Sequence, residues 1–259
     1  THSIKKIYKK NVQFEDLKNL KKYLLKLKKG LILIDKITIS QDIINFLWSQ
    51  KIKLNFIHDP IFILKSKKNI VEISNSKIAH LFDGVALAKL MSWLKTCDKK
   101  NLDEIKVQSK LEKIKNQNKY YLGRSFPTIA GFEKNASIIH YNASKNTNLK
   151  IENGIFLIDS GGQYKFGITD VTRTIAIGKQ NSIKKDIYTR VLKGHLAVSN
   201  FNLKQNTKGQ EIDRKARKFL KEKNFDYPHS TGHGVGYFLN VHETPPSISI
   251  KSKKKFYEG

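Results

Sequence analysis

The segment FLIDSGGQYKFGITDVTRTIAIG, residues 156–178, constrains the fold more than any other part of the chain. An apolar run ends at Asp159, a glycine-rich stretch follows, and an alternating run begins after Asp170. Glycine permits a tight reversal and alternation is typical of a strand, so the segment predicts a β-hairpin that brings the two carboxylates together. Close carboxylates in an apolar setting share a proton or need a cation, which favours a divalent metal site. The alternative is a solvated loop Asp159 and an Asp170 paired with Arg173 or a lysine.

A second segment, DYPHSTGHGVGYFLNVHET at residues 226–244, combines histidines with glycines. Neutral imidazole is a common ligand of divalent metals, and glycine lets the backbone approach a ligand closely. The spacing of His229 and His233 is that of a helical zinc pair, but the glycines argue against a helix. We interpret one histidine of the segment as a metal ligand and two, including His242, as facing the substrate. A surface loop with incidental histidines is the alternative.

A third histidine-containing segment is SIIHYN, residues 137–142. His140 stands among apolar residues, and the segment predicts a strand over 135–142. By itself, a histidine in an apolar strand is more often a structural residue than a catalytic one.

Residues 1–66 predict a small α/β unit. The patterns indicate a helix over 14–30, a strand over 31–40, a helix over 41–50 and an extended segment over 53–65 that is broken at Asp59-Pro60. From residue 67 the chain predicts long helices over 71–97 and 101–120, strands over 153–162 and 169–178, two more helices within 180–224 and a final extended region. The buried face of the first long helix is predicted to carry Ile78, Leu81, Phe82, Val85, Ala88 and Trp93.

The composition limits the partners that we expect. The 49 Lys and Arg against 22 Asp and Glu give a net charge of +27, but the lysines are spread along the chain, so we expect no nucleic-acid partner. Cys97 is the single cysteine, so no disulfide can form within the chain. There is no apolar run of about 18 residues, which predicts a cytoplasmic protein without a membrane span. Because the sequence starts at Thr1, we expect a fragment at its front.

Taken in order, the motifs SFPTI, SIIHY, LIDSGGQYKFGITDVTRT, VLKGHLAV and DYPHSTGHGVGYFLNVHE resemble the Xaa-Pro aminopeptidases of metallopeptidase family M24. The resemblance implies an α/β (α+β) chain. Its catalytic domain, residues 67–259, would have the pita-bread fold, and residues 1–66 would be part of a smaller α/β domain like the creatinase N-terminal domain. Such small domains commonly carry dimer contacts, so a homodimer is an assembly that the resemblance allows.

The resemblance also implies the roles of the site residues. Asp159, Asp170 and His233 match the family's metal ligands, with Asp170 as the carboxylate that bridges two metal ions. The histidines that match those holding substrate and assisting proton transfer are His140, His229 and His242. The family's remaining ligands are two glutamates, which would lie beyond Gly259. We therefore expect weak metal binding and little turnover from these residues alone.

The implied activity is release of the N-terminal residue from peptides with proline in second position, with two divalent ions, which we expect to be Mn²⁺, as cofactors. The partner is then a peptide substrate with an Xaa-Pro N-terminus. A dipeptidase for Xaa-Pro dipeptides or a creatinase-like hydrolase is the alternative within the fold. A catalytically inactive relative that binds peptides or histones is the alternative from another class.

Overall fold

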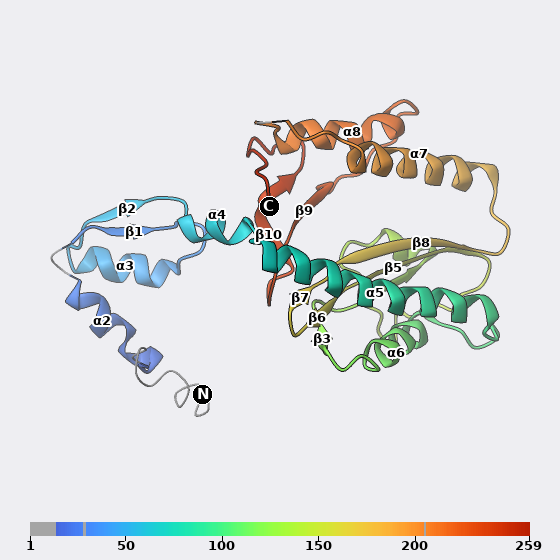
Figure 1. The fold of residues 1–259 in the computed structure, drawn as a ribbon, viewed down its shortest axis with the longest axis horizontal. Coiled ribbons are helices and arrows are strands. Elements are labelled where there is room, and N and C mark those ends of the chain that lie inside the picture. Colours follow the sequence, from blue (N-terminus) through green and yellow to red (C-terminus); the bar gives the residue numbers. More distant parts are fainter. Residues whose placement is uncertain (1–13, 28–29, 205) are drawn as a thin grey trace. The chain divides into compact units, whose positions relative to one another are not determined.

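The computed structural model describes residues 14–27, 30–204 and 206–259 (Figure 1). The chain divides into two compact units between Ile61 and Phe62. The domain boundary that we placed between residues 66 and 67 stays a prediction. Among the described helices, none is both long and apolar enough to span a bilayer.

The first unit is a parallel strand pair with a helix packed on it. It begins with η1 (Leu17–Asn19) and α2 (Leu20–Lys26), and then pairs β1 (Ile32–Ile34) with β2 (Leu54–Phe56) around α3 (Gln41–Ser49). Its core centres on Ile34, Leu47 and Ile52. The predicted helix over 41–50 is thereby confirmed. The strand predicted over 31–40 ends earlier, at Ile34, because the Asp35 side chain accepts a hydrogen bond from the Ile37 amide and starts a turn.

The extended segment predicted over 53–65 is wrong in its second half, which forms α4 (Pro60–Ser66). Asp59 Oδ1 accepts a hydrogen bond from the Ile61 amide at 2.8 Å, as an N-cap does. Proline suits the first position of a helix, where its missing N–H would have had no partner. Asp59-Pro60 therefore starts a helix instead of only breaking a strand.

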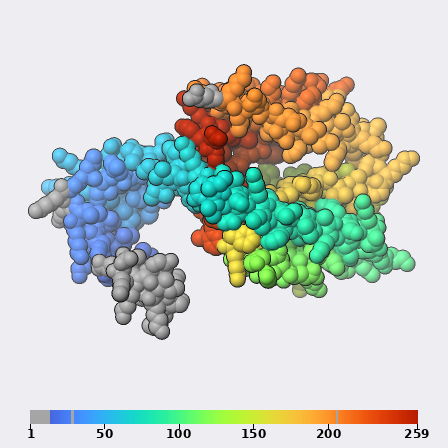
Figure 2. Space-filling view, in the orientation of Figure 1, coloured from blue at the N-terminus to red at the C-terminus, as the bar shows by residue number. Residues whose placement is uncertain are grey.

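In the second unit, two helices cover a three-stranded antiparallel sheet. The helices are α5 (Ile70–Thr96) and α6 (Glu104–Lys115), and the sheet has the order β4 (Ile129–Phe132), β5 (Gly154–Ser160) and β8 (Val171–Ile177). Asn69 and Glu72 form a capping box at the start of α5. Leu90, Leu111 and Phe156 are among the fully buried side chains of the shared core. Figure 1 shows α5 lying across the strands β5 and β8, and Figure 2 shows that it forms part of the surface.

The buried face predicted for α5 is wrong, although the helix itself is confirmed. Ile78, Leu81 and Val85 are 41%, 64% and 48% exposed. The buried residues of the helix are Ala79, Asp83, Ala86, Leu87, Leu90 and Leu94. A charged residue sits on the buried face because Lys115 of α6 pairs with Asp83 at 2.8 Å, a contact that the pattern of a single helix cannot reveal.

The predicted hairpin is present and carries a second, smaller hairpin at its tip. Asp159 of β5 pairs in register with Thr172 of β8, which confirms the antiparallel return. Between them, β6 (Gly162–Tyr164) and β7 (Gly167–Ile168) form a hairpin that pairs with β3 (Tyr121–Arg124). The chain continues through α7 (Ser182–Ser199) and α8 (Gly209–Lys221), which pack together, to the antiparallel pair β9 (Gly232–Val235) and β10 (His242–Ile248).

The strand predicted over 135–142 is wrong. Residues Glu133–Ser137 form the short helix η2, and His140 has a φ of 56°, which no strand residue adopts. Ile138 and Ile139 are 52% and 56% exposed, so the apolar pair that suggested a strand does not enter the core. The segment turns here because Asn135 and Tyr141 are held by buried Glu104.

Candidate metal centre

The β5–β8 pair sets Asp159 and Asp170 beside each other at the end of the sheet. Oδ1 of Asp159 is buried and accepts no hydrogen bond from the described residues. Burial raises the pKa of Asp170, and the neighbouring charge of Asp159 raises that pKa further. Close approach of the chain depends on Gly161, because a side chain there would collide with the Thr169 carbonyl and Ser125 Oγ. The two carboxylates therefore repel each other in a partly buried place.

The β9–β10 pair supplies two imidazoles to the same place. The rings of His233 and His242 lie edge to face with centroids 4.1 Å apart. Nδ1 of His233 donates to the Gly234 carbonyl at 2.7 Å, which leaves Nε2 as the free lone pair in the neutral ring. Burial and the neighbouring His233 lower the pKa of His242, so its neutral form is favoured.

These groups fit a divalent cation. His233 Nε2 lies 3.4 Å from Asp170 Oδ2, and donor atoms of Asp170, His233 and His242 all lie within 4.8 Å of one another. In addition, the buried Oδ1 of Asp159 has no hydrogen-bond partner among the described residues, so a cation bound here would also satisfy this oxygen. Mixed imidazole and carboxylate donors suit first-row divalent metals. His242, which the resemblance places on the substrate side, is thus within reach of the same ion.

His140 lies at the edge of this group. Its ring centroid is 6.3 Å from that of His242. The next residue, Tyr141, is buried and donates to Glu104 Oε2 at 2.8 Å. Glu104 is fully buried and also accepts from the amides of Phe132 and Leu149. This carboxylate on α6 therefore holds the turn that presents His140.

His229 is held by other contacts. Its ring stacks on Tyr227 with centroids 4.7 Å apart, and its Nδ1 donates to the Ser230 carbonyl at 2.9 Å. Its own carbonyl accepts from Arg217 of α8. The described contacts of His229 thus involve Arg217 of α8 and neighbours in its own loop. They do not include Asp170 or the residues grouped with it, which are Asp159, His233, His242 and His140. The roles of all six residues, Asp159, Asp170, His233, His140, His229 and His242, stay predictions.

Sequence reasoning missed His80 on α5. An electrostatic interaction with this histidine lowers the pKa of Asp170, and Nδ1 of His80 donates to the Ser76 carbonyl at 2.9 Å. It stands in a helix whose pattern indicated only a core element, so nothing in the sequence singled it out. Glu104 and Arg217 were missed for the same reason.

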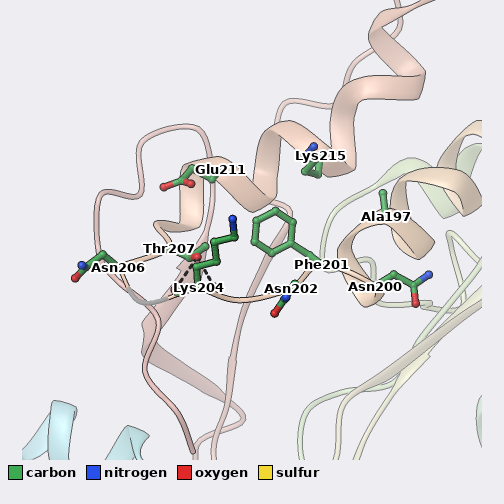
Figure 3. A pocket seen from close by; sticks show the side chains of 9 residues that line it. All are labelled: Ala197, Asn200, Phe201, Asn202, Lys204, Asn206, Thr207, Glu211 and Lys215. Carbon is green, nitrogen blue, oxygen red and sulfur yellow. Dashed lines mark hydrogen bonds between the residues drawn. The ribbon is translucent and has the colours of Figure 1, made fainter.

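A cavity of about 630 Å³ lies elsewhere, between the end of α7 and the start of α8. In Figure 3 the Phe201 ring stands between the side chains of Lys204 and Lys215, and Thr207 hydrogen-bonds the Lys204 backbone. The predicted site residues are absent from its lining, which consists of Ala197, Asn200, Phe201, Asn202, Lys204, Asn206, Thr207, Glu211 and Lys215.

Several proteins that are similar to this chain in sequence are named as Xaa-Pro aminopeptidases. The chain is 41% identical over 199 residues to Xaa-Pro aminopeptidase 1 of Dictyostelium discoideum, an alignment that covers 75% of this chain and 32% of the relative. It is 41% identical over 206 residues to a probable Xaa-Pro aminopeptidase P of Podospora anserina, covering 78% of this chain and 30% of the relative. The chain thus spans about a third of the length of these relatives.

Solved structures with the same fold include an X-prolyl aminopeptidase from Caenorhabditis elegans. It aligns with a TM-score of 0.84 at 26% identity, covering 97% of this chain and 42% of that one. The prolidase from Pyrococcus furiosus aligns with a TM-score of 0.79 at 26% identity, covering 96% and 70%. These neighbours confirm the mixed α/β, pita-bread fold class. The model of metallopeptidase family M24 matches residues 74–259, and the chain belongs to this family.

Proposed function

We propose that the protein, in its full length, is a metal-dependent aminopeptidase that releases the N-terminal residue from peptides with proline in second position. The observation that carries the proposal is the group of Asp170, His233 and His242 beside the unpartnered oxygen of Asp159. Its relatives are named Xaa-Pro aminopeptidases, and the nematode neighbour is described as a cytosolic enzyme with a di-nuclear active site. We infer two divalent ions, Mn²⁺ in our proposal, and a cytoplasmic location.

The chain's own residues would divide the work between holding the metal and handling the substrate. Asp159, Asp170 and His233 would hold the metal, with His242 beside them. Divalent ions in such a site lower the pKa of water and polarise a carbonyl. His140 and His229 would orient the peptide and move a proton at the departing proline nitrogen, because an imidazole can donate or accept near neutral pH.

The test uses the purified protein in its full length. We expect it to cleave a tripeptide of the Xaa-Pro-Xaa type with added Mn²⁺ and to lose this activity with a chelator. Substitution of Asp170 by Asn is expected to lower kcat/KM about 10²-fold or more, since the metal site loses a charged ligand. A protein that binds Mn²⁺ but leaves every Xaa-Pro peptide intact would refute the proposal and favour a non-catalytic peptide-binding role.

A dipeptidase is a second candidate because the prolidase neighbour aligns nearly as well as the aminopeptidase. Comparing rates on an Xaa-Pro dipeptide and on a tripeptide with the same first two residues separates the two. We expect the tripeptide to be the better substrate. A clear preference for the dipeptide would favour the dipeptidase over the aminopeptidase.

A further inference from the structure

Arg217 is a buried cation in a chain whose other described arginines are more exposed. Its side chain is 3% exposed and projects from α8 toward the loop before β9. A buried guanidinium costs much free energy unless its donors are used, because desolvation removes its hydration. Three nitrogens of Arg217 are in fact engaged, through Asp213 and the loop over residues 226–229.

The guanidinium binds several points of this loop. Its Nη1 donates to Asp226 Oδ1 at 2.7 Å and to the Tyr227 carbonyl at 2.6 Å. Its Nη2 donates to the His229 carbonyl at 2.7 Å. The planar fork of arginine can make these contacts at once, whereas the single ammonium of lysine cannot. One side chain thereby fixes the backbone on both sides of Pro228.

The same guanidinium starts a stack that ends at the imidazole of His229. The Arg217 carbon at the centre of the guanidinium lies 3.8 Å from the centroid of the Tyr227 ring, and that ring stacks on His229 at 4.7 Å and 27°. Cation–aromatic contacts of this kind are attractive, and most so when desolvated. The stack restrains the direction of the His229 ring, which is otherwise exposed.

Asp213 completes the network one turn earlier on α8. Its Oδ2 accepts from Arg217 Nε at 2.9 Å, and its Oδ1 accepts from Thr231 Oγ1 at 2.6 Å. Thr231 also shares a hydrogen bond with the Tyr227 hydroxyl. The network therefore joins α8 to the loop that carries His229 and to the residue just before β9.

We propose that Arg217, acting through Tyr227, is the positioning residue for His229. It fixes the loop and the ring plane so that the imidazole keeps one orientation while Nδ1 is engaged by the Ser230 carbonyl. This inference rests on the proposed function, because it gives His229 a task at the substrate. A misplacement of about 1 Å at a reacting group can cost ~10²-fold in rate, so such a restraint has a measurable effect.

The first test reads the orientation of His229 without any activity. Histidine labelled with ¹³C gives one Cε1–H signal for each histidine of the full-length protein, eight of which belong to this chain, and H229Q identifies the signal of His229. We expect this signal to be shifted upfield by the Tyr227 ring, and to lose the shift in R217K and in Y227L. An unshifted signal in the unsubstituted protein, or the same shift in R217K, would overturn the proposal.

The matched control is R190K. Arg190 makes contacts of the same kind, since its Nε pairs with Asp186 at 2.9 Å and its Nη1 donates to the Phe219 carbonyl at 2.9 Å. It ties α7 to α8 and touches none of the predicted site residues among its described contacts. R190K should therefore lower stability without moving the His229 signal. Y227L removes the ring that causes the shift, so in the NMR test it only identifies the source of the shift. Because Arg217 acts through Tyr227 in the proposal, Y227L should also lower kcat of the full-length protein as R217K does, and an unchanged kcat would overturn the proposal even where R217K does not fold.

The second test is kinetic and uses the protein in its full length. R217K is expected to lower kcat up to about 10²-fold with little change in KM. The double variant R217K/H229Q should be no slower than H229Q alone, because both changes remove the same interaction. Additive losses would show that Arg217 does not act through His229 and would overturn the proposal. If the unsubstituted protein cleaves no peptide, the proposed function fails and the NMR result alone decides on Arg217.

Discussion

The residues around Asp170 show how bound divalent cations would resolve several unfavourable contacts. Asp159 has a buried oxygen without a partner, and Asp170 has a carboxylate that its surroundings disfavour as an anion. Nε2 of His233 lies 3.4 Å from Oδ2 of that carboxylate. Each group alone could be accommodated by a proton. Together they form a set of oxygen and nitrogen donors of the kind that binds a divalent cation.

The raised pKa of Asp170 leads to a prediction about the metal-free protein. Because the folded state binds the proton more tightly than the unfolded state, Asp170 lowers stability as the pH rises through its folded-state pKa. At pH 7 the variant D170N should therefore melt at a higher temperature than the unsubstituted protein when both are free of metal. The difference should shrink as the pH falls toward 3.8, the ordinary value for aspartate.

Thermal melting with and without Mn²⁺ checks this expectation. The ion should raise the melting temperature of the unsubstituted protein and leave that of D170N unchanged. D186N is the control. Hydrogen bonding to Arg190 lowers the pKa of Asp186, so the ionised form of Asp186 stabilises the folded state, and D186N should lower the melting temperature slightly. A D170N variant that melts lower than the unsubstituted protein at pH 7 without metal would contradict the account.

At the scale of elements, α5, α6 and β5 are joined by one buried ion pair. Lys115 Nζ lies 2.8 Å from Asp83 Oδ1, and both side chains are almost fully buried. Asp83 Oδ1 also accepts from the Tyr164 hydroxyl, and Lys115 donates to Ser160 at 3.4 Å. Ser160 follows Asp159 directly, so the pair supports the end of the strand that carries the first carboxylate.

Removing one partner of this pair should cost far more than removing both. The variant K115M leaves Asp83 buried and unpaired, which is expected to lower the free energy of unfolding by about 3–5 kcal/mol. The double variant D83L/K115M should recover most of this loss, because apolar side chains of similar volume need no partner. Urea denaturation at pH 7 measures both. A double variant as unstable as K115M would mean that the ion pair is not the cause.

Gly161, in the turn between the carboxylates, and Gly84, within α5, should respond in opposite ways to substitution by alanine. A Cβ at Gly161 would meet the Thr169 carbonyl and Ser125 Oγ, and the backbone atom cannot move aside cheaply. G161A should therefore lower the free energy of unfolding by about 1–3 kcal/mol and weaken metal binding. Gly84 lies within α5 with nothing within 4 Å of its would-be Cβ, so G84A should stabilise by roughly 0.5–1 kcal/mol. Equal effects of the two changes would contradict this.

Elements whose pattern is complete within one segment could be predicted from the sequence. The β5–β8 hairpin and the helices α3, α5 and α6 were predicted because their periodicity is local. The buried face of α5 could not be predicted in this way, because burial of Asp83 depends on its ion pair with Lys115, 32 positions later in the sequence. The turn at His140 depends on Glu104, 37 positions before Tyr141. The same holds for the site. The motifs predicted its side chains, such as Asp170 and His233, but they did not predict the residues that support the neighbouring loops, such as Glu104 and Arg217.

At the scale of the whole molecule, the most prominent feature outside the site is the high positive net charge of the chain. With a net charge of +27 on 259 residues, repulsion between like charges destabilises the folded state. This repulsion is largest when little salt is present. The described ion pairs use few of the lysines. The described site itself consists of carboxylates and imidazoles, and no lysine belongs to it.

Stability should therefore rise with ionic strength over the range in which screening changes most. The Debye length falls from ~30 Å at 0.01 M salt to ~8 Å at 0.15 M, which removes most repulsion between separated surface lysines. We expect the thermal midpoint of the metal-free protein to rise by a few degrees, roughly 1 kcal/mol, over this interval. A midpoint that is constant or falls with salt would show that attractive pairs, and not the +27 net charge, dominate the electrostatic free energy of the folded chain.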